Sequence, residues 1–268
     1  MRACITTFFA VFSLLMLPLP AHASSVFMED MTWMEIRDRL AAGATIAIVP
    51  TGGTEQNGPQ MITGKHNYIA RYTAGEIAKR LKNAMVAPVV AYVPEGRITP
   101  PEGHMQFAGT FSVAPEVFAL VLEDIAASLK QHGFRTICFV GEHGGNQEIQ
   151  RQVAGKLNAK WSSSGVRVVH VADYYNDNNG QKQWAQSIGV KVMNPEAHAG
   201  FFDTSELLAV RPSGVDSSKF GVRTERHFQS TGSMGDSTRA SAQYGHRLLS
   251  LKVEAAVAQI QKASSGER

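Results

Sequence analysis

The fold is decided by the stretch Ile48-Val49-Pro50-Thr51-Gly52-Gly53-Thr54-Glu55-Gln56-Asn57-Gly58-Pro59, in which a buried-strand pattern opens into a glycine-rich loop. The design repeats at Ile137-Cys138-Phe139-Val140-Gly141-Glu142-His143-Gly144-Gly145-Asn146. A rigid strand end holds a loop that can approach a ligand closely, so metal and acid–base groups collect in such places. If both strands belong to one sheet, we expect Glu55, His66 and His143 to meet at its edge.

Helical and strand patterns alternate along the 268 residues and predict an α/β fold, with a mostly parallel sheet covered on both faces. Strands are expected at 44–49, 84–92, 135–141 and 166–172, and helices at 31–40, 68–81, 115–132, 146–162, 204–210 and 240–262. The stretch 174–200 is expected to be irregular, and 94–109 and 215–235 to be long loops. Such loops lie at the carboxyl ends of strands, where open α/β sheets bind ligands.

The first 23 residues are typical of a secretory signal peptide. Arg2 precedes an apolar core from Ile5 to Leu19, and Ala21-His22-Ala23 has the pattern of a cleavage site. The apolar core is shorter than the roughly 20 residues that span a bilayer, so no stable membrane anchor is expected. We therefore expect a secreted or periplasmic protein, cleaved near Ala23, with a single domain over residues 24–268.

Net charge and cysteine content argue against a nucleic-acid-binding protein and against an internal disulfide. The net charge is +3 and the basic residues are scattered, so no nucleic-acid partner is indicated. Cys4 lies within the signal peptide, which leaves Cys138 unable to form an internal disulfide after cleavage. Because Cys138 lies in a strand-like apolar run, we interpret it as a buried small hydrophobe rather than a reactive thiol.

Three side chains in the two glycine-rich loops are candidates for metal binding. Glu55 can ligate a divalent cation or act as a base. His66 precedes the helix expected at 68–81, and a helix N-terminus disfavours imidazolium, which keeps a ligand nitrogen available. His143 lies beside glycines that let the backbone turn sharply. Each has an ordinary alternative, as a solvated glutamate or as a capping or surface histidine.

Further polar residues have two interpretations each. Lys65 is either a solvated charge or a partner for an anionic substrate group, and Glu142 either orients His143 or is solvated. His104 either faces the site from the loop at 94–109 or is a solvated loop histidine. Asp203 and Asn146 are good N-cap types, so helix capping is the local role expected for them.

Five short motifs occur in order and together resemble the creatininase (creatinine amidohydrolase) family. They are Thr54-Glu55-Gln56-Asn57-Gly58-Pro59, Pro101-Glu102-Gly103-His104-Met105-Gln106-Phe107-Ala108-Gly109-Thr110, His143-Gly144-Gly145-Asn146, His198-Ala199-Gly200 with Asp203-Thr204-Ser205, and Gly235-Asp236. The resemblance covers nearly the whole mature chain. It implies a three-layer α/β/α fold, often in hexamers, with a zinc, manganese or iron centre that hydrolyses cyclic amides or formamides.

Departures from the family pattern alter the expected metal centre. Glu55 and His143 match ligand positions, and Asp203 stands for the family's glutamate and is taken as a further ligand. Asn57 replaces a usual ligand histidine, and His66 replaces the aspartate that usually bridges two metals. A neutral imidazole normally binds one cation and supplies no negative charge. We therefore expect one divalent cation per subunit, zinc best matching the ligands and manganese or iron also suitable.

The expected reaction is hydrolysis of a small cyclic amide by a metal-activated water, with His198 or Glu102 as the general acid–base. Substrate contacts are expected from Asn57, Lys65, His104 and Glu142. Creatinine itself is not expected, because Asn194-Pro195-Glu196-Ala197 lacks the Trp-Asp and Glu that precede the histidine in the family member using it.

Other functions remain open at this stage. The altered ligand positions also suit a non-catalytic periplasmic protein that binds a small ligand on the same fold. A hydrolase of a lactone or a cyclic polyol is a third possibility. The resemblance also implies a homo-oligomer, which could be a hexamer.

Overall fold

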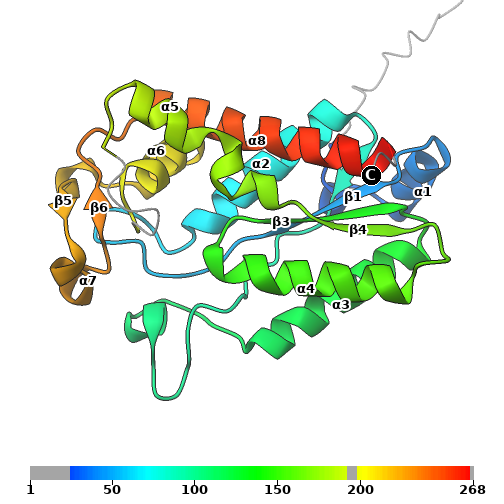
Figure 1. Cartoon of the computed structure of the whole chain (residues 1–268), viewed down its shortest axis with the longest axis horizontal. Helices are drawn as coiled ribbons and strands as arrows, with labels where there is room; N and C mark the ends of the chain where they lie inside the picture. The colour runs from blue at the N-terminus through cyan, green and yellow to red at the C-terminus, as the bar shows by residue number, and fades with distance from the viewer. Residues whose placement is uncertain (1–24, 192–197, 266–268) are drawn as a thin grey trace, which may run out of the picture.

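The computed structural model describes residues 25–191 and 198–265 (Figure 1). The expected signal peptide lies outside this range, and so do residues 194–197. Within the described residues no helix has the length and hydropathy needed to cross a membrane.

Four parallel strands form the central sheet, in the order β2-β1-β3-β4. They are β1 (Ile46–Thr51), β2 (Ala84–Val86), β3 (Thr136–Gly141) and β4 (Arg167–His170). One face is covered by α2 (Lys65–Leu81) and α8 (Ala242–Ser265), and the other by α3 (Pro115–Gln131) and α4 (Gly144–Lys160), as Figure 1 shows. Helix α6 (Phe201–Val210) packs against α2 and α8 beyond the carboxyl ends of the strands. The predicted parallel sheet between two helical layers is confirmed.

Alternate side chains of the central strands point to the two helical layers. In β1, Ala47 and Val49 belong to the apolar cluster on the side of α3 and α4, and Ile48 to the cluster on the side of α2 and α8. A strand buried on both faces requires an unbroken apolar run, which the sequence supplies. Cys138 is fully buried in the second cluster, and burial raises its pKa to about 12, in agreement with its predicted structural role.

Local chemistry sets the helix starts. In α1 (Trp33–Ala41), Thr32 and Glu35 form a reciprocal capping box that begins the helix. Helix α4 begins at Gly144, earlier than predicted, because His143 caps it through Nδ1. Asn146, expected as that cap, instead donates to Thr51 Oγ1 (2.8 Å) and Gly52 O (2.9 Å), which fastens α4 to the end of β1.

Several predicted boundaries need correction. Strand β2 ends at Val86 rather than at residue 92, and Pro88 follows with no N–H to donate. Helix α2 begins at Lys65, so His66 lies inside its first turn, and α6 begins at Phe201, so Asp203 is not its cap. The remaining differences are short elements inside predicted loops, namely α5 (Gln181–Ser187), β5 (Val222–Arg223), α7 (Glu225–Thr231) and β6 (Gly235–Asp236).

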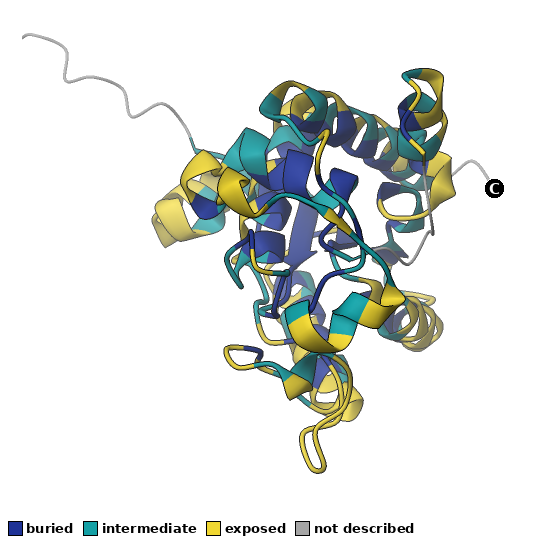
Figure 2. Cartoon of the chain, turned by 90° about the vertical axis from the view of Figure 1, so that its left-hand side faces the viewer, coloured by how far each residue is buried: buried dark blue, intermediate teal, exposed yellow. Residues whose placement is uncertain are grey.

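The strand order places a topological switch between β1 and β3. The chain leaves β1 through α2 to pair β2 on one side, while β3 pairs β1 on the other. Open α/β sheets bind ligands at such a point, outside the carboxyl ends of the strands. Figure 2 faces this end of the molecule, with the buried strands at the centre and exposed loops and helices around them.

Candidate metal centre

One buried carboxylate, Glu55, is surrounded by four imidazoles. Its oxygens lie 2.7 Å from His66 Nε2, 3.2 Å from His104 Nε2, 3.4 Å from His143 Nε2 and 3.8 Å from His198 Nδ1. Two groups of possible metal ligands share Glu55, one with His66 and His143 and the other with His104 and His198. Within each group the ligand atoms lie within 4.8 Å of one another. The structure thus brings the three predicted ligands together and adds a second possible set.

The loop that carries Glu55 is held against the start of α2 by Asn67. The Gly53 N–H donates to Asn67 Oδ1 (3.1 Å), and Asn67 Nδ2 donates to Thr54 Oγ1 (3.1 Å). A Cβ at Gly52 would lie 2.1 Å from Asn67 Oδ1, so this close approach requires glycine. The same contact fixes Glu55 beside His66, which lies in the first turn of α2.

Electrostatics keep the carboxylate ionised and three of the imidazoles neutral. Burial opposes the charge of Glu55, but hydrogen bonds from His143 and His66 outweigh it and hold its pKa well below the usual value. Burial, followed by the Lys65 charge, lowers the pKa of His66 to about 3. Burial also lowers the pKa of His104 to about 4 and lowers that of His198. Neutral imidazoles have a lone pair to offer a cation or a proton.

Gln56 determines which ring nitrogen carries the proton in His104 and in His198. Its Oε1 accepts the Gly58 N–H (3.0 Å), so its Nε2 faces His104 Nδ1 (2.7 Å) and donates to it. The proton of neutral His104 therefore lies on Nε2, directed at Glu55. His198 Nε2 lies 2.9 Å from the Gln56 carbonyl oxygen, which can only accept. His198 therefore carries its proton on Nε2 and presents a lone pair at Nδ1 toward Glu55.

These proton positions favour the group of Glu55, His66 and His143 as the cation site. His66 Nδ1 has no hydrogen-bond partner among the described residues, so either nitrogen of that ring can hold the proton. His143 Nδ1 accepts only a long contact from the Gly145 N–H (3.2 Å), whereas His104 is held in its donor form by the shorter bond from Gln56. Zinc ligands at about 2.0–2.1 Å in a tetrahedron lie about 3.3 Å apart, a spacing compatible with this group.

A second buried carboxylate, Glu95, lies beside this group and was not assigned a role from the sequence. Its side chain has 0% exposure, and its Oε2 is 3.0 Å from His143 Nε2. Burial, and then the neighbouring Glu55 charge, raise the pKa of Glu95 to about 10. The sequence feature that could have identified Glu95 as a site residue is its position directly after Val93-Pro94, near the end of a predicted strand.

Both carboxylate oxygens of Asp203 are engaged by protein partners, which corrects its predicted role as a ligand. Its Oδ1 lies 3.0 Å from the buried Lys65 Nζ, and its Oδ2 accepts the Ala199 N–H at 2.8 Å. Burial opposes its charge, but Lys65, His198 and His66 together outweigh burial and hold the pKa of Asp203 well below its usual value. Both oxygens are engaged, so Asp203 balances the charge of Lys65 at the cavity wall.

Two further predictions are corrected by where the side chains lie, and a third stays a prediction. Glu102, proposed as an acid–base group, is exposed and pairs with Arg97. Asn57, proposed to contact substrate, is buried and donates to the backbone of Glu55 (2.9 Å), which braces the loop. Glu142, also expected to contact substrate, lies outside the cavity around Glu55 and pairs with the buried Lys252 of α8, but it lines a neighbouring cavity, so its substrate contact stays a prediction.

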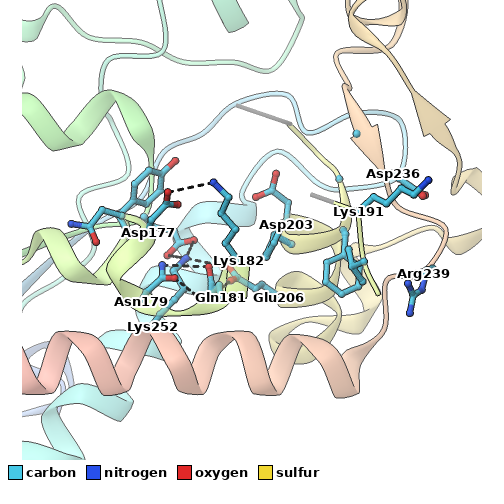
Figure 3. Close-up of a pocket in the computed structure, with 18 of the residues that line it drawn as sticks. Asp177, Asn179, Gln181, Lys182, Lys191, Asp203, Glu206, Asp236, Arg239 and Lys252 are labelled. Atoms are coloured by element: carbon cyan, nitrogen blue, oxygen red, sulfur yellow. Dashed lines mark hydrogen bonds and ion pairs between the residues drawn. The ribbon is translucent and has the colours of Figure 1, made fainter. Parts of the chain in front are cut away.

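Two cavities meet at this centre. The first, of about 590 Å³, contains Glu55 and the four imidazoles, with Lys65 and Asp203 in its wall and Phe228 contributed by α7. The second, of about 380 Å³, shares only His66, Tyr175 and Asp203 with the first. Figure 3 shows this second cavity above α8, with Lys252, Gln181 and Glu206 gathered together and Arg239 at the other end.

Comparison with known proteins places these features in a family. A family model described as creatinine amidohydrolase, Creatininase, matches residues 29–260. The chain belongs to the creatininase family. The resemblance seen in the sequence is confirmed, and so is the prediction of a metal-dependent hydrolase at the level of the family.

Similar proteins differ in what their names say they act on. The mycofactocin precursor peptide peptidase of Mycolicibacterium smegmatis is 29% identical over 63% of this chain, and the match spans only 60% of that relative. The 3-dehydro-scyllo-inosose hydrolase of Thermotoga maritima is 27% identical over 83% of this chain and 70% of its own length. A manganese form of creatininase has a TM-score of 0.75 at 23% identity, and a zinc–zinc form of a creatininase mutant has 0.74 at 23%. Each covers 90% of this chain and 99% of the solved chain.

Proposed function

We propose that this chain hydrolyses a carbon–nitrogen bond of a small cyclic amide or related molecule, using one divalent cation per subunit. The observation that carries the proposal is the convergence of Glu55, His66 and His143, with one ionised carboxylate and a neutral His66, at the switch point of the sheet. Two imidazoles and a carboxylate suit zinc best, and manganese or iron(II) also bind such sets.

The cation, His198 and His104 have different roles in the proposed reaction. A bound divalent cation lowers the pKa of a coordinated water toward neutrality and polarises a substrate carbonyl. The His198 Nδ1 lone pair is placed to accept a proton from the attacking water and to return it to the leaving nitrogen. The His104 Nε2–H is placed to donate to the substrate oxygen as it gains negative charge. Their rings lie 4.5 Å apart, which brings a proton acceptor and a donor to the same substrate.

The cavity supports a small and partly apolar substrate. Phe228 packs edge-on against the rings of His104 and His198, at 5.9 and 6.5 Å, so an apolar wall lies beside the acid–base pair. The buried Lys65 is balanced by Asp203, which leaves little excess charge for a strongly anionic substrate. Creatinine is not proposed, because the sequence at 194–197 lacks the corresponding recognition residues, and these residues lie outside the described range.

A second candidate is hydrolysis of a cyclic polyol or a lactone. The relative from Thermotoga maritima, named for 3-dehydro-scyllo-inosose, favours it, because that match extends over 83% of this chain. The same cation, proton acceptor and oxygen-directed donor serve a carbonyl group in either substrate.

Turnover by metal-reconstituted protein tests the proposal. Purified protein is loaded with zinc, manganese or iron(II) and incubated with cyclic amides, formamides, short peptides, lactones and inososes, with mass spectrometry of the products. We expect a cyclic amide to be hydrolysed, and Glu55→Gln protein to be inactive on the same substrate. Tight binding of an unconverted ligand by all metal forms would instead support a non-catalytic binding protein.

Location and assembly are part of the same proposal. We infer export followed by cleavage near Ala23, giving a secreted or periplasmic enzyme that assembles as a homo-oligomer, with a hexamer as one possibility. Mass spectrometry of the exported protein should give a chain lacking residues 1–23, and light scattering gives the number of subunits. An intact N-terminus in the exported fraction would contradict cleavage.

A further inference from the structure

Glu95 is a buried carboxylate that the proposed chemistry does not use. Its residue exposure is 3%, and neither carboxylate oxygen has a well-aligned hydrogen bond from any described residue. Burial and the neighbouring Glu55 keep Glu95 in its protonated form, and a buried carboxyl group without well-aligned partners is costly and persists where a ligand compensates for it. Its Oε2 lies 3.0 Å from His143 Nε2, the same nitrogen that faces Glu55 at 3.4 Å.

The loops around Glu95 are shaped to hold its side chain at this position. A Cβ at Gly53 would fall 2.3 Å from Glu95 Oε1, so the first glycine-rich loop leaves room for that oxygen. The Glu95 N–H donates to Ser112 Oγ (3.0 Å), and Ser112 donates to the Gly96 carbonyl oxygen (2.8 Å). A Cβ at Gly145 would lie 2.8 Å from the Pro94 oxygen, so the second glycine-rich loop is fitted to the same segment.

Charge balance indicates what Glu95 does there. With Glu55 alone, a divalent cation among neutral imidazoles leaves an excess positive charge in a buried site, and burial makes such an excess costly. Asp203 cannot supply the compensating charge, because both of its oxygens are engaged by Lys65 and a backbone N–H. Glu95 holds its proton while the site is empty, and on releasing it to solvent as a cation binds it would bring the total to two negative charges, which neutralise a divalent cation.

We propose that Glu95 is a fourth ligand of the cation site and supplies its second carboxylate beside Glu55. This inference rests on the proposed function and extends it, since it concerns the same cation. The resulting set of two carboxylates and two imidazoles draws on three loops and α2. It selects a hard or borderline divalent cation, because carboxylate oxygens favour such ions.

Zinc affinity of the metal-stripped mature protein tests this ligand, measured by competition with a chromogenic chelator. We expect Glu95→Gln to weaken zinc binding by at least about tenfold, the lower end of what supporting groups of metal sites contribute. The matched control is Glu102→Gln in the same loop, whose exposed side chain pairs with Arg97, and it should bind zinc as the wild type does. Circular dichroism and thermal unfolding in chelator verify that each variant is folded.

The outcomes separate this inference from the proposed function. Unchanged zinc affinity in folded Glu95→Gln, with binding lost in Glu55→Gln, would overturn the role of Glu95 and leave the hydrolase proposal standing. Absence of zinc binding in the wild type would overturn both. If Glu95→Gln does not fold, zinc-loaded wild-type crystals decide the question. A Glu95 oxygen about 2.0–2.2 Å from zinc supports the inference, and one clearly outside bonding distance refutes it.

Discussion

Two buried clusters of charged side chains lie on either side of His66 and Asp203, and they differ in how their polar atoms are satisfied. In the cluster below the second cavity, Lys252 Nζ lies 2.8 Å from Glu142 and 3.2 Å from Glu206. Gln181 donates to the other Glu206 oxygen at 2.5 Å, and Tyr174 donates to Glu142. Each of these charges has protein partners.

The cluster around Glu55 is organised in the opposite way. An oxygen of Glu55, both oxygens of Glu95 and Nδ1 of His66 are buried without a well-aligned hydrogen bond among the described residues. Buried polar groups in folded proteins are nearly always paired, so unpaired ones mark where a ligand completes the structure. This contrast indicates a structural role for the Lys252 cluster and supports the proposed metal binding by the Glu55 cluster.

Glu55→Gln should have the largest effect, on metal and activity together. The neutral amide removes the one carboxylate common to both ligand groups, so we expect no measurable turnover and zinc affinity lowered by more than about 100-fold. Metal analysis after dialysis checks this, with unfolding in chelator as the control for the fold. If zinc is retained at one per chain, Glu55 is not the central ligand.

Lys252→Met should separate the two clusters by acting on stability alone. Removing the ammonium leaves Glu142 and Glu206 buried without a cation, and breaking a buried ion pair in this way costs about 3–5 kcal/mol. Urea unfolding of metal-stripped protein measures the change. The folded fraction should still bind one zinc per chain, and a loss of zinc with unchanged stability would reverse the assignment of the two clusters.

His104→Gln should lower turnover by about 100-fold or more and leave zinc bound, because the lost group donates to the substrate oxygen. His143→Gln is the paired variant and should lose zinc. Kinetics and metal analysis on the same preparations distinguish them. Equal zinc loss in both variants would mean that the group containing His104 also holds a cation.

The pH dependence of stability should have opposite signs in the two clusters. His66 has a pKa lowered from about 6.5 to about 3, so the unfolded state binds its proton first and stability falls as pH drops below about 6.5. Glu206 has a pKa raised to about 7, by burial in the first place, so its contribution is present below about pH 4.5 and is lost as pH rises toward 7.

Single variants of the metal-stripped protein isolate the contribution of each group to the change of unfolding free energy with pH, measured between pH 5 and 6.5. His66→Gln should reduce the rise of unfolding free energy with pH by about 1 kcal/mol per pH unit, and Glu206→Gln should steepen it by a similar amount. Urea unfolding at several pH values gives both numbers. Slopes that change in the same direction would contradict the contrast between the clusters.

The convergence of the three candidate metal ligands could be predicted because each lies next to a strong local signal. Glu55 and His143 come after apolar runs that end in glycine, and such runs fix the strands and therefore the edge at which the loops meet. His66 was placed just ahead of a helix and lies in its first turn. The parallel sheet likewise follows from runs that are apolar on both faces of each strand.

The remaining site residues depend on tertiary contacts that local sequence does not encode. Glu95 and Glu102 lie in one loop and have the same chemistry, but one is buried at the centre and the other is exposed beside Arg97. The difference arises because Ser112 and Gly53 hold Glu95 inward. The donor role of His104 depends on the orientation of Gln56, and no periodicity reveals an amide orientation.

Anomalous diffraction at the zinc edge, from zinc-loaded crystals of the wild-type protein, tests the central claim most directly. The account predicts one strong peak per chain, bounded by Glu55, His66 and His143, on the side of Glu95. A peak held instead by His104 and His198, or no peak near Glu55 under conditions where zinc binds, would contradict it.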